Sequence, residues 1–328
     1  GEGGIVNSAY YNNPASQTTL NVMNSISGDT EGVGTNLPTI SDAVDFTIRG
    51  MGESPYTIGS RDRDDGWNRG YAISNSSVNI SNLTFDSFGV QESVPGLYLQ
   101  DVSAYGAGLS IDELSSVSLN GVSFTNSRIE GEGNLAAHAN FYGGAISNSG
   151  SLIISGGIFS ANELESTNRY SSRTGGNAYG GAIYNTGSLT LTGVTISGNR
   201  VVSQRNEGSA LGGGIYTTKG ITLAGGNLFS NNTDRNGNRN NDIYFAGGNL
   251  YVNGSGSDEY NIISGGIASA ENGNSTIVIT DSGKLRLEGD NSDFSGGATV
   301  AGEGSVLTYA GSLNDSILKA TTTVNGSG

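Results

Sequence analysis

The chain has 328 residues, no cysteine and a net charge of −15, with 54 glycines and 4 prolines. Glycine without a period of three, together with scarce proline, excludes collagen. The acidic excess argues against nucleic acid as a partner, because that affinity depends on lysine and arginine at the phosphates. No stretch approaches the ~20 apolar residues of a transmembrane helix, so we expect no direct membrane insertion of this chain.

The first part of the chain shows no repeat over residues 1–39, where we expect a cap or lead-in. Residues 40–58 read ISDAVDFTIRGMGESPYTI, and their short apolar runs between turn residues predict early strands. A weak copy of the later repeat starts at Tyr71.

Residues 60–70, SRDRDDGWNRG, are the candidate acidic site of the chain, with Asp62, Asp64, Asp65 and Trp67. Glycoside hydrolysis needs two carboxylates across a cleft, so these residues keep a polysaccharide lyase or hydrolase open as an alternative. We interpret the segment as a solvated corner, because one loop rarely supplies a whole catalytic set. A single histidine and no cysteine give no zinc pattern, and we expect neither a metal ion nor a cofactor.

A repeat then dominates the chain. Aligned on the residue before a pair of small residues, its copies start at Tyr105, Tyr142, Tyr179 and Leu211, with spacings of 37, 37 and 32. The third copy reads YGGAIYNTGSLTLTGVTISGN, in which apolar and small polar residues alternate between glycine and asparagine turn signals. Such a unit is too short to close a core by itself, so the copies must stack.

This pattern predicts an all-β fold, a single right-handed parallel β-helix of roughly a dozen coils, each of roughly 20–25 residues. Glycine pairs should form tight turns, Ile146, Ile183 and Ile215 one internal stack, and Phe124, Phe159, Ile196 and Phe229 another. We expect Asn162 and Asn199 to adopt left-handed corners and to form an asparagine ladder between coils. The structural repeat positions are Gly143, Gly144, Ile146, Phe159, Asn162, Gly180, Gly181, Ile183, Ile196, Asn199, Gly212, Gly213, Ile215, Phe229 and Asn232.

Residues 162–178 and 199–210 are polar and irregular, and we expect them to be loops ejected from one corner of successive coils. Loops on a rigid scaffold often carry binding. The candidate ligand-binding residues are Tyr98, Asn168, Tyr170, Arg173 and Arg205. Tyr142 and Tyr179 are as consistent with mutual stacking as with a partner. Residues 40–240 are therefore expected to form a loop-bearing β-helix, and residues 241–328 plainer coils without long loops.

Paired motifs carry a family resemblance across residues 70–310. Gly143-Gly144-Ala145-Ile146 and Gly180-Gly181-Ala182-Ile183 precede Phe159-Ser160-Ala161-Asn162 and Ile196-Ser197-Gly198-Asn199, and Gly212-Gly213-Gly214-Ile215 precedes Phe229-Ser230-Asn231-Asn232. This resembles the GGA(I/L/V) and FxxN repeats of the polymorphic outer-membrane proteins, which are autotransporter adhesins on a pectin-lyase-like β-helix. Residues 285–306, LRLEGDNSDFSGGATVAGEGSV, resemble autotransporter passenger coils more widely.

The resemblance implies a passenger domain at the bacterial surface or secreted from it, exported across the outer membrane by a barrel that we expect to lie outside this chain. Our leading hypothesis is a non-catalytic adhesin that binds a host-cell or matrix receptor, a surface glycan or a neighbouring cell. The first alternative is a structural protein that binds other copies of itself to form aggregates, biofilm matrix or filaments. The second is the polysaccharide-degrading enzyme described above.

Overall fold

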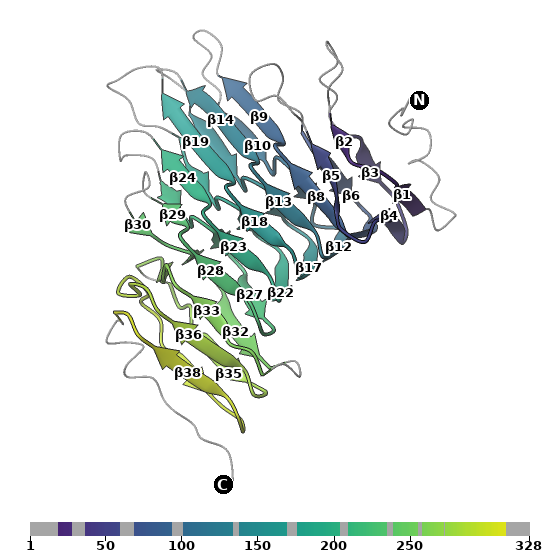
Figure 1. The fold of residues 1–328 in the computed structure, drawn as a ribbon. Coiled ribbons are helices and arrows are strands. Elements are labelled where there is room, and N and C mark those ends of the chain that lie inside the picture. The colour runs from purple at the N-terminus through teal and green to yellow at the C-terminus, as the bar shows by residue number, and fades with distance from the viewer. Residues whose placement is uncertain are drawn as a thin grey trace.

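The computed structural model describes residues 19–27, 37–59, 69–93, 101–133, 138–168, 176–203, 209–234, 239–254, 258–271 and 273–312. Its strands run across the long axis of the molecule and succeed one another from the N-terminal to the C-terminal end (Figure 1). Every regular element within these ranges is a strand, and no helix among them is long and apolar enough to span a membrane.

Three parallel sheets form the body of the molecule, and the first eight described coils contribute one strand to each of them, whereas the last two contribute only to sheets A and B. Sheet A contains β1 (Thr19–Val22), β4 (Phe46–Gly50), β7 (Ser77–Ser81), β12 (Ser116–Asn120), β17 (Ser151–Ser155), β22 (Ser188–Thr192), β27 (Gly220–Leu223), β32 (Asn249–Asn253), β35 (Ile277–Thr280) and β37 (Ala298–Val300). Sheet B contains β2 (Ile26–Ser27), β5 (Tyr56–Gly59), β8 (Leu83–Asp86), β13 (Ser123–Thr125), β18 (Ile158–Ser160), β23 (Thr195–Ser197), β28 (Leu228–Ser230), β33 (Asn261–Ile263), β36 (Lys284–Leu287) and β38 (Val306–Tyr309). Sheet C contains β3 (Thr39–Ser41), β6 (Tyr71–Ser74), β11 (Leu109–Ile111), β16 (Ile146–Asn148), β21 (Ile183–Asn185), β26 (Ile215–Thr217), β31 (Ile243–Phe245) and β34 (Ile267–Ser269).

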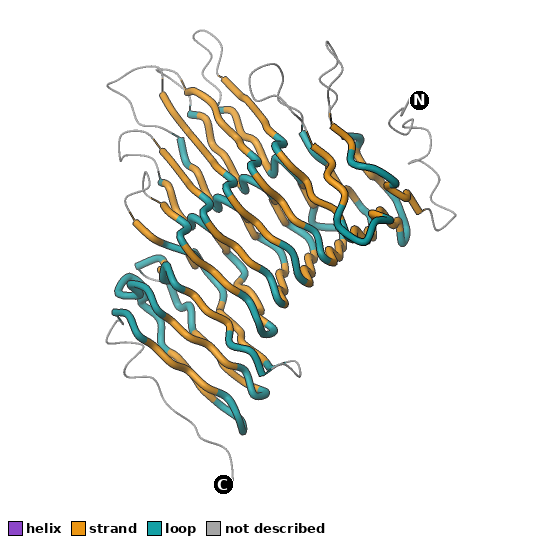
Figure 2. The backbone as a smooth tube through the Cα atoms, viewed as in Figure 1, coloured by secondary structure: helices purple, strands orange, loops and turns teal. Residues whose placement is uncertain are grey.

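This arrangement confirms the parallel β-helix, with the turns of successive coils aligned along the molecule (Figure 2). The described residues form ten coils, as the ten strands of sheets A and B show. The expected coil length of 20–25 residues holds near the C-terminus, where Val278 pairs with Thr299. It is wrong in the middle, where Asn79 pairs with Ser118, 39 positions later. The extra residues of the longer coils build two further sheets.

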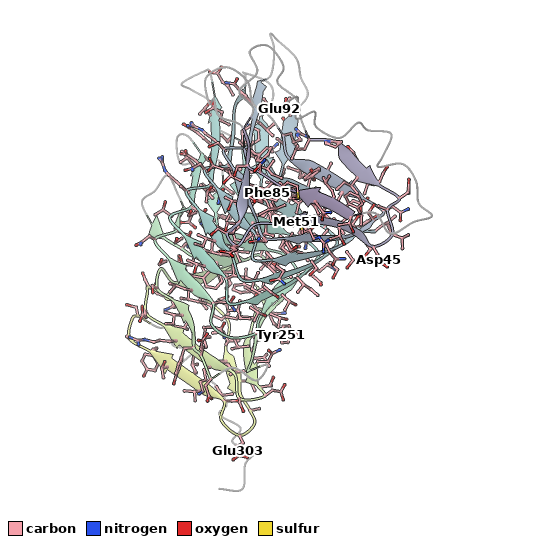
Figure 3. All side chains as sticks on the ribbon, turned by 45° about the vertical axis from the view of Figure 1, so that its right-hand side comes forward. Asp45, Met51, Phe85, Glu92, Tyr251 and Glu303 are labelled. Atoms are coloured by element: carbon pink, nitrogen blue, oxygen red, sulfur yellow. The ribbon has the colours of Figure 1, made fainter. Side chains whose placement is uncertain are left out.

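The core consists of like residues stacked from coil to coil. Ile146, Ile183 and Ile215 pair in register and are fully buried, which confirms the predicted stack. The second predicted stack is confirmed too, since Phe124, Phe159, Ile196 and Phe229 pair in register and are fully buried. The phenylalanine column extends to Phe85, whose ring lies 4.9 Å from that of Phe124 and inside the coils (Figure 3). Fully burying one such side chain contributes about 1.5–3 kcal/mol.

The alternation within each strand explains this core. In β22, Leu189 and Leu191 are buried while Ser188 is exposed, because successive side chains of a strand point to opposite faces. The predicted tight turns before sheet C are also present, since Gly143, Gly180 and Gly212 all have φ between +69° and +75°. A Cβ on Gly180 would collide with the carbonyl oxygen of Ile183.

Two smaller sheets form a projection that we call the flange, at the upper left of Figure 1. Sheet D contains β9 (Gly89–Ser93), β14 (Arg128–Gly133), β19 (Glu163–Asn168), β24 (Arg200–Ser203), β29 (Thr233–Asp234) and β30 (Arg239–Asn240). Sheet E contains β10 (Val102–Tyr105), β15 (Ala139–Tyr142), β20 (Ala178–Tyr179) and β25 (Ala210–Leu211).

The flange corrects the expectation of irregular loops over residues 162–178 and 199–210. Most of the described residues there pair with the coils above and below, because they continue the register that the body imposes. Four excursions leave the body along sheet D and return along sheet E, whereas the last leaves along β29 and returns along β30, antiparallel to it within sheet D.

An asparagine ladder joins the flange to the body, as predicted. The Nδ2 of Asn162 donates to Oδ1 of Asn199 over 2.8 Å, and the Nδ2 of Asn199 donates to Oδ1 of Asn232 over 2.8 Å. The Oδ1 of Asn199 also accepts the backbone N–H of Asn162, and the Oδ1 of Asn232 accepts that of Asn199. Each Nδ2 also donates to a backbone carbonyl oxygen of the preceding coil, which for Asn199 is that of Phe159. All three side chains are fully buried, and these bonds satisfy their polar atoms.

The predicted left-handed conformation of Asn162 and Asn199 is wrong. The positive φ angles belong to the residues just before the ladder, Ala161, Gly198 and Asn231. The turn therefore occurs one residue earlier, and it aims the asparagine side chain into the core instead of outward.

The ladder ends on a buried carboxylate. Asp242 accepts the Nδ2 of Asn232 over 2.6 Å on one oxygen and the N–H of Gly265 over 2.6 Å on the other. A carboxylate suits this position because both of its oxygens accept and neither has to donate further. Burial raises the pKa of Asp242 to about 6, despite the hydrogen bonds that favour the charged form.

Replacing Asn199 by alanine should lower the free energy of unfolding by about 3 kcal/mol, because each buried polar group left without a partner costs about 1–3 kcal/mol. Urea unfolding of the variant measures the loss. The control is Asn120→Ala, at an exposed asparagine of β12, which should change stability by less than about 0.5 kcal/mol. Equal effects of the two substitutions would contradict the ladder.

Asp242 should make the protein more stable as the pH falls from about 6 to about 4. In that range the folded carboxyl binds its proton while the unfolded one, with a pKa near 3.8, does not. The contribution is complete below the unfolded pKa and absent above pH 6, and two pKa units correspond to about 3 kcal/mol.

Urea unfolding across this pH range tests the prediction, with Asp242→Asn expected to remove that part of the slope. Asp45→Asn, at an exposed aspartate, is the matched control and should keep it. A slope that is unchanged in Asp242→Asn would show that the carboxyl does not titrate as proposed.

Candidate functional site

Most of the predicted ligand-binding residues lie outside the described residues. This holds for Tyr98, Tyr170, Arg173 and Arg205. The backbone of Asn168 is described, and it ends β19 in register with Gly133 of β14. These candidates remain predictions.

The candidate acidic site, Asp62, Asp64, Asp65 and Trp67, also lies outside the described residues. The segment that contains it connects β5 to β6, from sheet B to sheet C. It too remains a prediction.

The flange holds a thin core between its two sheets. Ile129, Leu164 and Val201 of sheet D and Phe141 of sheet E are fully buried. The Phe141 ring packs where Gly131 of sheet D has no side chain, since a Cβ there would lie 2.7 Å from its Cζ. The hydroxyl of the fully buried Ser166 donates to the carbonyl oxygen of Ala139 over 2.6 Å. Apolar packing and this bond hold sheet E in a fixed position against sheet D.

Tyrosines line the outer face of sheet E at the point where the flange meets the body. Tyr105, Tyr142 and Tyr179 pair in register, each just before the turn into sheet C. The rings of Tyr105 and Tyr142 stack with centroids 4.8 Å apart and planes at 12°. Those of Tyr142 and Tyr179 lie 5.9 Å apart and are tilted by 44°. Tyr142 and Tyr179 thus lie next to each other, as expected, but their rings are tilted and not stacked.

A second column of tyrosines runs along the outer face of sheet C. Tyr184, Tyr216 and Tyr244 pair in register on β21, β26 and β31. Their rings stack with centroid separations of 5.5 Å and 5.6 Å and interplanar angles of 16° and 8°.

The two columns meet across the angle between sheet E and sheet C. The ring of Tyr142 lies 4.9 Å from that of Tyr184, and the ring of Tyr179 lies 4.4 Å from that of Tyr216. The six rings therefore form one continuous cluster, which we call the tyrosine array: Tyr105, Tyr142, Tyr179, Tyr184, Tyr216 and Tyr244. Tyr105 at its N-terminal end is 44% exposed, and the other five are half-buried.

Amide side chains lie beside the array. Asn140 and Asn177 precede Tyr142 and Tyr179 by two residues, so each shares the outer face of sheet E with its tyrosine. The Oδ1 of Asn140 accepts the N–H of Asn177 over 2.9 Å, and the Oδ1 of Asn177 accepts the N–H of Ser209 over 3.1 Å. Asp101 accepts the N–H of His138 over 2.7 Å and lies next to this row.

Three phenols of the array, those of Tyr142, Tyr184 and Tyr216, have raised pKa values and stay protonated well above neutral pH. Burial raises the pKa of Tyr142 to about 12, with smaller contributions from Tyr105, Tyr184, Tyr179 and Asp101. Burial and neighbouring tyrosines also raise the pKa of Tyr184 and of Tyr216. Each hydroxyl can therefore both donate and accept a hydrogen bond.

The opposite face of the flange is charged. On the outer face of sheet D, Arg128 lies 2.6 Å from Glu130, 2.5 Å from Glu165 and 3.8 Å from Glu163. A depression of about 510 Å³ there is lined by Gln91, Glu92, Glu130, Glu132, Glu165 and Thr167. Within the part of the chain that the structure describes, no group of three or more histidine, cysteine, aspartate or glutamate residues is arranged to hold a metal ion.

A shallow groove of about 760 Å³ runs along another corner of the body, between sheets C and A. Ser116, Ser151 and Ser188 stack along it, and Leu114 and Tyr251 flank it. Among the described residues that line this groove, Glu113 and Lys219 are the charged ones.

Sequence reasoning found half of the array. The alignment on Tyr105, Tyr142 and Tyr179 identified one column, but Tyr184, Tyr216 and Tyr244 were not recognised as its neighbours. The signal was a tyrosine after the inward isoleucine, in Ile183-Tyr184, Ile215-Tyr216 and Ile243-Tyr244. Joining the two columns requires the angle between sheets E and C, which a repeat alignment does not contain.

Comparisons of the chain with protein-family models, with curated proteins and with solved structures found no match.

Alkaline titration followed by the absorbance of tyrosinate should show a late phase, above the ordinary range near pH 10, because burial raises the pKa of Tyr142, Tyr184 and Tyr216. Tyr142→Phe should remove amplitude from that late phase. The same titration in urea should show one ordinary phase. An unchanged late amplitude in Tyr142→Phe would contradict the burial of this phenol.

Proposed function

We propose that this chain is a non-catalytic adhesin, an extracellular rod of the autotransporter passenger type that binds other surfaces. The observation that carries the proposal is the asymmetry of the rod: five successive coils add the flange on one side, and the tyrosine array lies at its base. Tyrosine offers a large contact area at a low cost in conformational entropy, which suits a binding surface.

The solenoid supports this role mechanically. Backbone hydrogen bonds of three sheets hold each coil on the next, so the flange and the array keep fixed positions relative to each other. Many copies of such a rod on one surface would add weak contacts into strong attachment, since linked binding events raise avidity by 10²–10⁴.

Self-association is a second candidate, and a different observation favours it. Ile153 on sheet A and Ile158 on sheet B are each 47% exposed, and Leu228 on the same face of sheet B is 38% exposed. Ile153 and Ile158 belong to the same coil, and Leu228 lies two coils further along, in the column of Ile158. Apolar side chains gathered on a surface can mark a contact between copies.

Beads coated with the chain at graded densities should attach to epithelial cells or to films of matrix protein more than in proportion to density, and excess soluble chain should compete. Albumin-coated beads are the control. Attachment at the albumin level on every surface and at every density would overturn the proposal. Sedimentation over a wide concentration range separates the second candidate, which requires dimers or longer species where the adhesin requires a monomer.

A further inference from the structure

We propose that the tyrosine array binds an uncharged linear polysaccharide of pyranose rings, laid along the axis of the rod. This inference rests on the proposed function as a binding rod and names the ligand class of its binding surface. The array spans five coils, from Tyr105 to Tyr244, which at a spacing of roughly 4.8 Å per coil is a track of about 19 Å.

The fold does not need tyrosine at these positions. On the outer face of sheet C, the column of Tyr184, Tyr216 and Tyr244 continues as Ser147 in one direction and as Ala268 in the other. Coils on both sides are thus built in the same register with small side chains. Two of the three tyrosines, Tyr184 and Tyr216, contact the tyrosine rings of sheet E, which points to a role at that surface.

The geometry of the rings determines what the array can offer. Most neighbouring rings lie nearly parallel, so their faces cover one another and their edges and hydroxyl groups point away from the sheets. The edge of an aromatic ring is its electropositive part. A row of such edges with phenol hydroxyls favours ligands rich in oxygen acceptors and hydroxyl donors, whereas a cation needs an open ring face.

The charge of the surroundings excludes an anionic ligand. Besides burial, the pKa of Tyr142 is raised by other tyrosines and by Asp101, and the pKa values of Tyr184 and Tyr216 are raised by other tyrosines. With that carboxylate nearby and a net charge of −15 on the chain, an anion would be repelled, and its desolvation against neutral rings would be costly. An uncharged polyol meets neither penalty.

The amides supply fixed polar partners at the same interval as the rings. Asn140 and Asn177 lie one coil apart beside Tyr142 and Tyr179, with their oxygens held by backbone N–H groups. No described residue accepts a hydrogen bond from the Nδ2 of Asn177, so this donor is available to a ligand. Aromatic surface with a few fixed polar groups is the usual composition of a small-ligand site.

The period of the array distinguishes a polysaccharide from a peptide. Coils repeat every 4.7–4.9 Å, and the ring centroids within the array lie between 4.4 Å and 5.9 Å apart. Side chains on one face of an extended peptide recur only about every 6.6 Å, so a peptide loses register within two coils. A chain of pyranose rings advances by about one coil per sugar and can repeat the same contacts.

Affinity electrophoresis of the native chain tests the proposal. The protein migrates through gels that contain hydroxyethyl cellulose, xyloglucan or galactomannan, and through gels that contain heparin or polygalacturonate as charged counterparts. At least one neutral polysaccharide should retard the chain, and the charged ones should not.

Two variants locate the site. Tyr184→Phe/Tyr216→Phe/Tyr244→Phe keeps the stacked rings and removes their hydroxyls, and should weaken retardation at least tenfold. Asn140→Ala/Asn177→Ala removes the amides and should also weaken it. The control is Tyr251→Ser, at a tyrosine that is 45% exposed on sheet A, far from Glu92 of the flange in Figure 3; its retardation should match that of the unchanged chain.

Retardation by none of the neutral polysaccharides would overturn the inference, as would equal retardation by the charged ones or no effect of the tyrosine and asparagine variants. Circular dichroism confirms that each variant keeps its strands. Bead attachment is measured on the same variants. Attachment that persists without any polysaccharide retardation would overturn this inference and leave the proposed adhesin standing, whereas loss of both would remove the two together.

Discussion

The structure depends on one constraint, the in-register parallel pairing of each coil with the next. Because Ile146 pairs with Ile183 and Ile183 with Ile215, each position of the repeat is placed on the equivalent position one coil away. Apolar residues then form continuous columns, and asparagines form a ladder in which each Nδ2 donates to the Oδ1 of the next asparagine and to a backbone carbonyl oxygen. A short repeat thereby closes a core that no single copy could close. Cysteine is dispensable in this design, since successive coils are already joined along three sheets.

The same constraint stacks groups that would repel one another, and the chain resolves each case locally. Glu130 and Glu165 pair directly on sheet D, and Arg128 lies against both. The asparagine ladder ends on a carboxylate, which accepts the last donors but becomes a weaker acid through its burial. Among the clustered tyrosines, Tyr142, Tyr184 and Tyr216 remain neutral because burial raises their pKa. The surface proposed for binding thus arises from the same in-register pairing as the core. It repeats Tyr and Asn side chains at the coil spacing on the outside, as the core repeats apolar side chains on the inside.

Sequence reasoning predicted what depends on period two and on the repeat: the strands, the isoleucine and phenylalanine stacks, the glycine turns and the asparagine ladder. It failed where a shift of one residue decides which side chain faces the core. Ala161 takes the left-handed conformation that was expected at Asn162. It also failed over residues 163–168, because a polar stretch with weak alternation becomes a strand only when neighbouring coils offer it an edge. The tyrosine array was recognised only in part, because its two columns belong to different sheets, E and C, whose contact a repeat alignment does not contain.

The register itself can be measured directly, because the chain has no cysteine of its own. Ser151 and Ser188 pair on adjacent coils with their hydroxyl oxygens 3.4 Å apart, whereas Ser151 and Thr190 are diagonal neighbours roughly 7–8 Å apart. A disulfide needs Cα atoms within about 7 Å. Mass spectrometry after mild oxidation should find the Ser151→Cys/Ser188→Cys pair closed and the Ser151→Cys/Thr190→Cys pair as free thiols. Closure of the diagonal pair in preference to the direct one would contradict the register on which the core, the ladder and the tyrosine array all depend.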